Sequence, residues 1–435
     1  MIPVLTENLH DDLAHYIATY DKIRQDYMQD VASMGLDFEE TDETDETLSP
    51  LIRSVCPVGI NSANDGKSLF YGSRSLACEY SRKGDKSITF YLSLRCNHHC
   101  FYCFNPNQEG YETYQQELLP AVHELEEMHA HHKNLACIAL SGGEPLLHPH
   151  ECIQFFQRAH SLYPKAHLRL YTAGDLLTEQ LTTDLKDAGL NEIRISIKPD
   201  ESIAGQEKAL RGLSFARTKI PAVWVEMPVF PNQREWMEKL LLRLDKMNID
   251  GINLLELCFP FSKAEEFVRR GYRLKRSIAR VIYDYWYAGG LAIAGSEQET
   301  LHLLEFASSK KLRLHVHYCS LENKHTAQIY EQNHGVAGDD FLHFSPRDFF
   351  IKTAKCFGED AIKAISVLSR DSYRQISNGI EIPLTKLKKL PADIQLGIAY
   401  YVVEHRPEGL CLREVSIIPY LSQTIQDDPH YLEHL

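Results

Sequence analysis

The sequence predicts an α/β protein built around a parallel β-sheet, and three observations support this. Six β-rich apolar runs follow one another, at residues 87–95, 136–143, 167–174, 192–199, 222–230 and 252–259. Longer helix-like segments alternate with them, at residues 113–131, 149–162, 177–188, 203–216 and 233–247. The runs are largely uninterrupted by polar residues, which is typical of strands covered by helices on the faces of a sheet. The sheet is therefore barrel-like or doubly wound, and in both architectures ligands bind at the carboxyl ends of the strands.

The segments that flank these units are less regular. Residues 10–33 have helical spacing of apolar side chains, and the acidic run near 37–48 is expected to be a solvated loop. After residue 260 helix-like segments lead to one more strand-like run, LRLHVHYCS. We therefore divide the chain into an N-terminal extension, a core, a continuation of the core and a C-terminal domain, at residues 1–86, 87–260, 261–335 and 336–435.

Composition restricts the classes of function. The 435 residues carry 46 Lys and Arg against 60 Asp and Glu, a formal net charge of -14, so there is no overall basic field to attract nucleic acid. We find neither an N-terminal signal pattern nor an apolar run of the roughly 20 residues that span a bilayer. Eleven cysteines are too few for a disulfide scaffold in a chain of this length. We expect a soluble, cytoplasmic protein.

The densest group of metal-ligand residues is CNHHCFYC, directly after the first predicted strand. Cys96, Cys100 and Cys103 supply three thiols within eight positions. A structural zinc site needs four ligands, so His98 or His99 would have to complete a Cys3His set. Three thiolates can instead hold three irons of a [4Fe-4S] cluster and leave the fourth iron open to a substrate or cofactor.

This motif resembles the C-x3-C-x2-C signature of radical S-adenosylmethionine (SAM) enzymes, including the aromatic Tyr102 before the last cysteine. The second predicted strand ends in SGGEP, residues 141–145, which is similar to the segment that binds the methionine amino group of SAM in that family. The resemblance implies a partial (β/α)6 TIM-like barrel with N-terminal helical and C-terminal extensions. It also implies two cofactors, a [4Fe-4S] cluster and SAM.

The resemblance further implies roles for individual residues of the two motifs. The three cysteines would ligate the cluster. Gly142 and Gly143 would let the backbone approach the methionyl end of SAM, and Glu144 would accept a hydrogen bond from its ammonium group. Tyr102 would lie against the adenine, and the alternative for Tyr102 is ordinary packing beside the cluster.

Four further polar residues are candidates for SAM contacts. In this family the fourth and fifth strands often contact the sugar and carboxylate, which makes Ser196, Lys198 and Glu226 candidates; alternatively they are outward-facing polar positions on an exposed part of the sheet. Glu256 lies inside the apolar run LLELCF, where an unpaired charge is costly to bury. It either pairs with a cation or lines the cavity, and we favour the cavity.

A narrower resemblance covers roughly residues 70–325. The blocks RSLACEYSRKGDKS, AVWVEMPVFP, INLLELCFPFSKAEEFVRRGY, AIAGSEQETLHLLEFA and LHVHYCS look like those of an uncharacterised radical SAM group related to pyruvate formate-lyase activating enzyme. Only the cysteine and GGEP blocks are strongly specific.

The HVHYCS segment is the best remaining candidate for substrate chemistry. His315, His317 and Cys319 share one strand face, and the thiol of Cys319 could donate a hydrogen atom to a substrate radical. The alternative is a pair of histidines and a cysteine satisfied at a strand end. Cys56 and Cys78 could join Cys319 in space or be small buried apolar residues.

The function that the resemblance implies is reductive cleavage of SAM to a 5′-deoxyadenosyl radical, which abstracts a hydrogen atom from a substrate. We favour a peptide or protein substrate, with a small metabolite or a tRNA as alternatives; the acidic charge disfavours tRNA. The reaction needs a one-electron donor such as flavodoxin or ferredoxin. A non-catalytic iron-sulfur or zinc-binding regulatory protein is the competing hypothesis.

Overall fold

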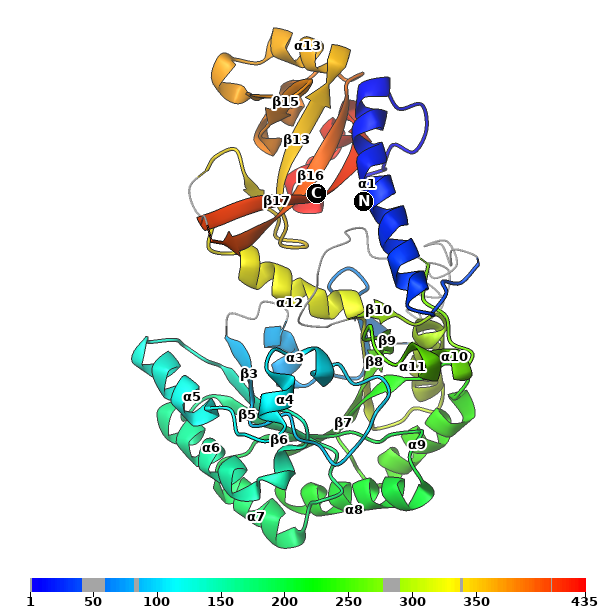
Figure 1. Cartoon of the computed structure of the whole chain (residues 1–435), viewed down its shortest axis with the longest axis vertical. Helices are drawn as coiled ribbons and strands as arrows, with labels where there is room; N and C mark the ends of the chain where they lie inside the picture. The colour runs from blue at the N-terminus through cyan, green and yellow to red at the C-terminus, as the bar shows by residue number, and fades with distance from the viewer. Residues whose placement is uncertain (1, 41–58, 82–85, 277–289, 337–338, 408) are drawn as a thin grey trace. The chain divides into compact units, whose positions relative to one another are not determined.

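The computed structural model describes the whole chain except residues 1, 41–58, 82–85, 277–289, 337–338 and 408 (Figure 1). It divides into two compact units. The larger comprises Met34–Ser277 and Tyr285–His325, and the smaller comprises Met1–Ser33 and Thr326–Leu435 together with Ile278–Asp284, which lies outside the described residues. Cys56 and residues 41–48 of the expected acidic loop also lie outside them.

The larger unit contains a nine-stranded sheet in the order β1-β2-β11-β8-β7-β6-β5-β4-β3. Six neighbouring strands are parallel and follow the chain order: β3 (Ser87–Tyr91), β4 (Cys137–Ser141), β5 (His167–Thr172), β6 (Glu192–Ile195), β7 (Ala222–Val229) and β8 (Gly251–Glu256). The strand β11 (His315–Cys319) extends this array parallel to β8. The antiparallel strands β2 (Ser68–Tyr71) and β1 (Ile60–Ala63) then complete the sheet. The predicted α/β class with a parallel sheet is confirmed, and β1 and β3 are its two edges.

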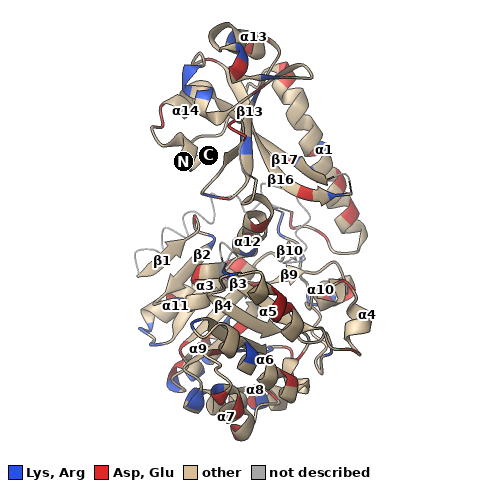
Figure 2. Ribbon diagram, turned by 90° about the vertical axis from the view of Figure 1, so that its left-hand side faces the viewer, with Lys and Arg blue, Asp and Glu red and all other residues tan. Residues whose placement is uncertain are grey.

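Helices follow the parallel strands and cover one face of the sheet, as the arc of α5 to α9 in Figure 1 shows. They are α5 (Ala121–Ala130), α6 (Pro149–Leu162), α7 (Glu179–Asp187), α8 (Ile203–Lys219) and α9 (Arg234–Lys246). Each helix is amphipathic and packs its apolar side on the sheet, as α7 does with the buried Leu185. The same helix is capped at its start by Thr178, whose hydroxyl accepts a hydrogen bond from Leu181 N at 3.1 Å. Acidic and basic side chains are intermingled on these helices (Figure 2).

The remaining elements of the larger unit are shorter. They are α3 (Leu76–Ser81), η2 (Asn105–Asn107), α4 (Tyr111–Tyr114), η3 (Pro145–Leu147), β9 (Cys258–Phe259), α10 (Ala264–Arg269), β10 (Leu291–Ala292) and α11 (Ser296–Ser309). The hydrophobic core lies between the sheet and its helices, where Leu140, Leu170, Ile195 and Leu254 are fully buried.

The other face of the sheet is lined by polar and charged side chains. Side chains alternate along a strand, so the neighbours of the buried apolar residues point to this inner face. It carries Arg169, Glu192, Arg194, Glu226, Asn253 and His317. Strand β6 ends at Ile195, earlier than the predicted 199.

The smaller unit is built on an antiparallel sheet with the order β14-β15-β13-β16-β17, to which β12 adds beside β13. The strands are β12 (His343–Phe344), β13 (Ile351–Phe357), β14 (Arg374–Ile376), β15 (Gly379–Ile382), β16 (Gln395–Arg406) and β17 (Gly409–Leu421). The helices are α1 (Asp11–Ser33), α13 (Gly358–Val367), η4 (Arg370–Ser372), η5 (Leu384–Lys389), α14 (Ser422–Gln426) and α15 (Tyr431–His434). The helix predicted over residues 10–33 is thus present, and α12 (Leu321–Asn333) contains the boundary between the two units.

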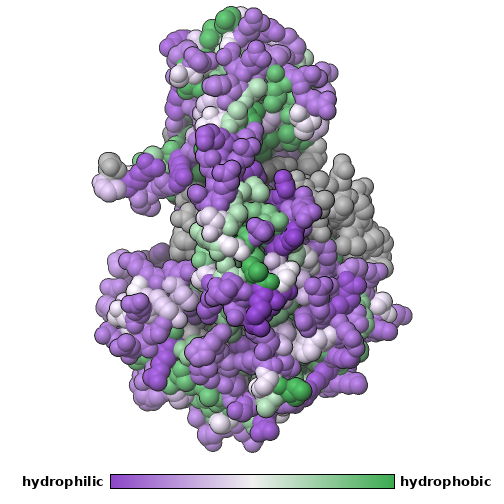
Figure 3. Space-filling model, turned by 45° about the vertical axis from the view of Figure 1, so that its right-hand side comes forward, coloured by the Kyte–Doolittle hydropathy of each residue, from purple (hydrophilic) through white to green (hydrophobic). Residues whose placement is uncertain are grey.

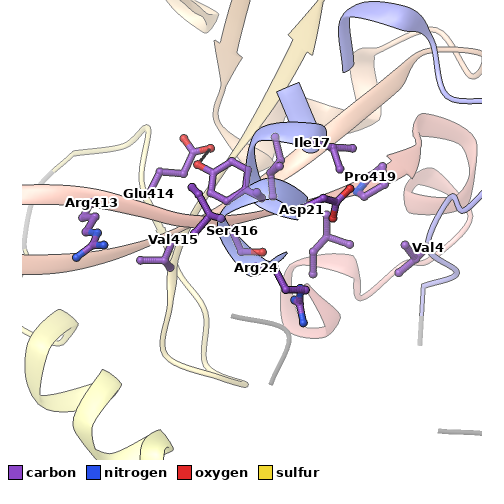
Figure 4. A pocket seen from close by; sticks show the side chains of 13 residues that line it. Val4, Ile17, Asp21, Arg24, Arg413, Glu414, Val415, Ser416 and Pro419 are labelled. Atoms are coloured by element: carbon purple, nitrogen blue, oxygen red, sulfur yellow. Dashed lines mark hydrogen bonds between the residues drawn. The ribbon is translucent and has the colours of Figure 1, made fainter. Parts of the chain in front are cut away.

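A core cluster that includes Leu13 and Ile417 joins α1 to this sheet. Beside it, a cavity of about 460 Å³ lies between α1 and β17 and is lined by residues such as Ile17 and Val415 (Figure 4). Glu414 accepts hydrogen bonds there from the hydroxyls of Tyr16 and Tyr20, at 3.1 and 2.8 Å. The network fastens the N-terminal helix to the C-terminal sheet.

The surface seen in Figure 3 is mostly hydrophilic, with smaller apolar patches between the polar side chains. Among the helices that the structure describes, none combines the length and the hydrophobicity that a membrane span requires.

Candidate functional site

The two predicted motifs lie side by side at the carboxyl edge of the parallel sheet. Strands β3 and β4 are parallel neighbours, with Tyr91 paired to Ser141. The cysteine segment follows β3, and the GGEP segment follows β4. Cys96 is exposed, whereas Cys100 and Cys103 are half-buried. Adjacent parallel strands therefore bring together two motifs that are about forty residues apart in the chain.

Backbone hydrogen bonds fasten one motif to the other. Gly143 N donates to Ser93 O at 2.8 Å, and Glu144 N donates to Arg95 O at 2.8 Å. A Cβ on Gly142 would lie 2.2 Å from Ser93 O, and one on Gly143 would lie 2.0 Å from Arg95 O. The two glycines are thus required by the close approach of the chain that leads into Cys96, and their role toward the methionyl group of SAM stays a prediction.

Three side chains that the sequence analysis missed fasten the cysteine segment to its neighbours. Asn105 Nδ2 donates to Gly142 O at 2.8 Å, and Asn107 Nδ2 donates to Pro260 O at 2.8 Å. Lys263 Nζ donates to Cys100 O at 3.2 Å. The two asparagines could have been found from their position directly after the last cysteine, in FNPNQ. Lys263 could not, because it lies about 160 residues further along the chain.

Burial and two lysines set the electrostatics of the three thiols. Burial raises the pKa of all three, and that of Cys100 to about 11. The charge of Lys198 acts in the opposite direction on each thiol, and Lys263 adds to it at Cys103. Lys198 is buried and lies beside the thiols, where it favours the thiolate, the form that binds metals. Its contact with SAM, for which it was a candidate, stays a prediction.

His98 is held between two carboxylates. Its Nδ1 lies 2.5 Å from Glu201 Oε1, and its Nε2 lies 3.3 Å from Asp175 Oδ1. The hydrogen bond with Asp175 raises the pKa of His98. Both ring nitrogens are therefore engaged, and neither is free to complete a Cys3His zinc site. His99 is exposed.

Glu144 accepts hydrogen bonds from three groups of the protein, and its contact with the ammonium group of SAM stays a prediction. Its Oε1 accepts from Thr172 Oγ1 at 2.6 Å and from Leu146 N at 3.0 Å, and its Oε2 accepts from Ala173 N at 2.6 Å. The side chain is buried, and burial raises its pKa. Its carboxylate ties the GGEP segment to the end of β5, so both oxygens already serve the fold.

Tyr102 is packed among aromatic rings. Its ring centroid lies 5.1 Å from that of Phe101 and 5.3 Å from that of Phe230, both in edge-on geometry. Its buried hydroxyl finds no hydrogen-bond partner among the described residues, and its pKa is raised by burial and by the neighbouring Cys100 and Asp200. This environment agrees with the alternative that Tyr102 simply packs beside the cluster, and its contact with the adenine of SAM stays a prediction.

Glu226 lies on the inner face of the parallel sheet, and Ser196 lies at the carboxyl edge of the sheet, directly after β6. Glu226 pairs with Arg194 and accepts from Asn253 Nδ2 at 2.7 Å. Burial raises the pKa of Glu226, but these two partners outweigh burial and hold the pKa below its usual value. Ser196 N continues the ladder past β6 by donating to Thr172 O at 3.0 Å. Glu226 is therefore an inward-facing residue of an ion pair, and Ser196 lies at the carboxyl edge.

Glu256 is paired with a cation, the alternative that we did not favour. Its Oε1 lies 3.8 Å from Lys275 Nζ, and its Oε2 accepts from Leu321 N at 2.8 Å. Lys275 lies closer to Glu297, at 2.6 Å. Because one lysine serves two carboxylates, burial and Glu297 prevail and the pKa of Glu256 rises to about 7.

The residues of the HVHYCS segment alternate as predicted. His317 and Cys319 lie on the inner face, whereas Tyr318 is buried on the other and donates to Glu297 Oε1 at 3.0 Å. His317 Nε2 lies 2.8 Å from Ser68 Oγ, and Ser73 N donates to His315 Nδ1 at 3.1 Å.

Cys319 on β11 and Cys78 on α3 each have a hydrogen-bond donor near their sulfur. Asn323 Nδ2 lies 3.2 Å from Cys319 Sγ, and Arg194 Nη2 lies 3.2 Å from Cys78 Sγ. Burial raises the pKa of Cys319 to about 11, which keeps its thiol protonated at neutral pH.

The profile of the Radical SAM superfamily matches residues 90–244, from β3 to near the end of α9. These are the residues that carry both motifs and the five strands from β3 to β7. The part of the chain from residue 90 to residue 244 belongs to the radical SAM superfamily.

Other similarities are more distant. A protein of Methanocaldococcus jannaschii named "Putative glycyl-radical enzyme activating enzyme" is 27% identical over 264 residues, which are 58% of this chain and 64% of that protein. This radical SAM chain thus spans less than two thirds of that relative's length.

Two solved structures are similar to parts of the chain. Streptococcus suis SuiB bound to S-adenosylmethionine has 12% identity and a TM-score of 0.40, covering 54% of this chain and 50% of that one. The radical SAM methyltransferase TsrM from Kitasatospora setae, with cobalamin and a [4Fe-4S] cluster bound, has 16% identity and a TM-score of 0.38, covering 55% and 56%.

The superfamily implies a [4Fe-4S] cluster and SAM, the two cofactors that the sequence predicted. Within the described residues, no three His, Cys, Asp or Glu side chains are already arranged to hold a metal ion. The residues present nevertheless fit the cluster chemically, because three thiols without a fourth ligand occur in one segment beside Lys198. They fit SAM because the GGEP segment is held directly against that segment.

Proposed function

We propose that this radical SAM chain is an enzyme that binds a [4Fe-4S] cluster through Cys96, Cys100 and Cys103 and reductively cleaves SAM. The observation that carries the proposal is the fastening of the GGEP segment to the chain that leads into Cys96, at Gly143 N to Ser93 O. This hydrogen bond supports a single site made of the cysteine segment and the GGEP segment. When bound, the cluster and SAM supply a 5′-deoxyadenosyl radical for hydrogen abstraction.

The chain's own residues have three tasks in this proposal. Cys96, Cys100 and Cys103 hold three irons, and the positive charge of Lys198 offsets part of the negative charge of their thiolates. The backbone of Gly142 and Gly143 fixes the distance between the two motifs. Packed aromatic rings around Tyr102 and Phe230 exclude water from one side.

Ser196, Lys198, Glu226 and Glu256 remain proposals as SAM contacts. Ser196 fits best, because it lies at the carboxyl edge of the sheet. Glu226 and Glu256 fit less well, since each is already engaged by a cation.

Cys319 is our candidate for hydrogen-atom transfer. Its thiol is buried on the inner face, and its raised pKa keeps the hydrogen on sulfur. A transfer to a substrate radical would break the S–H bond, form a C–H bond and leave a thiyl radical, which one electron from the donor and one proton would reduce.

We favour a peptide or protein as the substrate and flavodoxin or ferredoxin as the electron donor. The name of the M. jannaschii relative supports a protein substrate, because a glycyl-radical enzyme is itself a protein. A small metabolite is the alternative. The net charge of -14 and the intermingled charges in Figure 2 give little support to tRNA.

The test is anaerobic reconstitution with iron and sulfide, reduction with dithionite and chromatography for 5′-deoxyadenosine. We expect product from the wild type and from the control Cys411→Ala, and none from Cys100→Ala. Absence of cleavage in a preparation that binds SAM would refute the proposal. A colourless protein that contains zinc and no iron would instead favour the non-catalytic regulatory function.

A further inference from the structure

The inner face of the parallel sheet carries one row of polar side chains across three neighbouring strands. Glu226 on β7 is paired in register with Asn253 on β8, and Asn253 is paired with His317 on β11. Residues in register on adjacent strands point to the same side, so the three side chains lie next to one another. The hydrogen bond between Asn253 and Glu226 agrees with this arrangement.

Charged groups of both signs lie beside this row. Arg194 donates from Nε to Glu192 Oε1 at 2.7 Å, from Nη1 to Glu226, and from Nη2 to Cys78 Sγ at 3.2 Å. All three of its nitrogens are therefore engaged. Arg169 and Arg194 offset the charges of Glu192 and Glu226, and Arg74 lies near His317.

Two atoms of the row have no partner among the described residues: Asn253 Oδ1 and His317 Nδ1. The residues are only 4% and 2% exposed. Asn253 must turn Nδ2 toward Glu226, because a carboxylate only accepts, so its Oδ1 points elsewhere. His317 uses Nε2 toward Ser68 Oγ, which leaves Nδ1. Buried polar atoms without partners are costly and rare, and a pair of them on neighbouring strands indicates an incomplete binding site.

We propose that Asn253 and His317 bind an uncharged amide group of the substrate, either a peptide bond or a carboxamide. Asn253 Oδ1 accepts from the amide N–H. His317 Nδ1–H donates to the amide carbonyl, while the hydroxyl of Ser68 donates to His317 Nε2. The inference deepens the proposed function and rests on it, because it names the chemical group by which the substrate of that enzyme is held.

The surroundings favour an amide over an ion. Burial, with Arg194 and Arg74 nearby, lowers the pKa of His317 to about 3, so its ring is neutral at physiological pH. An anion at this position would face Glu226, and a cation would face Arg194. A neutral group with one donor and one acceptor satisfies both unpartnered atoms and adds no charge.

The position also suits the proposed chemistry. Cys319 is the next residue after His317 on the same face and lies nearer the carboxyl edge, where the cluster cysteines follow β3. An amide held by Asn253 and His317 therefore brings its neighbouring carbon atoms toward Cys319.

The test is nuclear magnetic resonance of the full chain labelled with ¹⁵N-histidine, with N-methylacetamide as the probe. His317→Gln assigns the signal of His317. We expect a saturable shift of the His317 ring nitrogens with N-methylacetamide, and none with acetate or methylammonium at equal concentration. Asn253→Leu should weaken binding roughly tenfold, whereas Asn61→Leu, at an exposed asparagine of β1, should leave it unchanged.

No saturable shift, or acetate binding as tightly as the amide, would overturn the inference. So would unchanged binding in a folded Asn253→Leu variant. If that variant does not fold, the selectivity of the wild type among the three probes decides the question. The outcome is independent of the cleavage assay: a chain that binds the amide but forms no 5′-deoxyadenosine refutes the proposed function, and one that forms 5′-deoxyadenosine but does not bind the amide refutes only this site.

Discussion

Gly143 and Ser93 are joined by a backbone hydrogen bond of 2.8 Å that fastens the segment after β4 to the chain entering Cys96. A Cβ at position 143 would meet Arg95 O at 2.0 Å, so Gly143→Ala must push the two segments apart. We expect a loss of about 1–3 kcal/mol in the free energy of unfolding and a lower iron content after reconstitution. Denaturant unfolding and iron analysis measure both.

The matched control for that substitution is Gly335→Ala, since nothing lies within 4 Å of the Cβ added there. It should leave the iron content unchanged. Full iron loading of a Gly143→Ala protein would contradict the coupling of the two motifs.

His98→Gln separates a cluster of three cysteines from a zinc site that uses histidine. Both ring nitrogens of His98 face carboxylates, so we expect the variant to keep its iron and sulfide. It should lose about 1 kcal/mol of stability from the weakened contacts with Asp175 and Glu201. Metal analysis after anaerobic reconstitution is the measurement. Loss of all bound metal from a variant with an unchanged circular dichroism spectrum would make His98 a ligand.

Local patterns in the sequence were sufficient for much of this fold. Apolar runs and helical periodicity predicted the six parallel strands with their intervening helices, and the helix over 10–33, because both depend on residues close in the chain. The end of β6 was predicted four residues too late, since the alternation of apolar and polar residues continues beyond the end of the strand at Ile195.

The hydrogen-bond and ion-pair partners of the site residues could not be predicted from such local patterns. The pairing of Glu226 with Arg194 and of Glu256 with Lys275 depends on which strands and loops become neighbours, which no local spacing encodes. The glycines of the GGEP segment were expected to allow a close approach, and the neighbour that approaches them in the structure is the backbone of the cysteine segment. A resemblance indicates which residues matter and not which contacts they make.

Glu256 should make the stability depend on pH. Its pKa rises from 4.5 to about 7 in the folded chain, so the folded state binds more protons than the unfolded state between these values. Stability therefore falls as the pH rises from about 4.5 to about 7, by up to roughly 3 kcal/mol. Unfolding in urea at pH 5 and pH 8 should show this decrease in the wild type and a smaller one in Glu256→Gln. An equal decrease in both would contradict the assignment, and Glu265→Gln, at an exposed position of α10, should behave as the wild type does.

Tyr102 tests whether an aromatic ring before the last cysteine holds SAM or only fills space. Its buried hydroxyl has no hydrogen-bond partner in the part of the chain that the structure describes, so Tyr102→Phe should keep or raise the stability, by up to about 1 kcal/mol, and should leave SAM affinity unchanged. Tyr102→Leu should weaken SAM binding to the reconstituted protein by about 0.5–1.5 kcal/mol if the ring contacts the adenine. Tyr163 is the matched control, because its buried hydroxyl also lacks a partner among the described residues while its ring packs in the core under the helices. If Tyr102→Leu and Tyr163→Leu both bind SAM as the wild type does, Tyr102 is a packing residue and the adenine lies elsewhere.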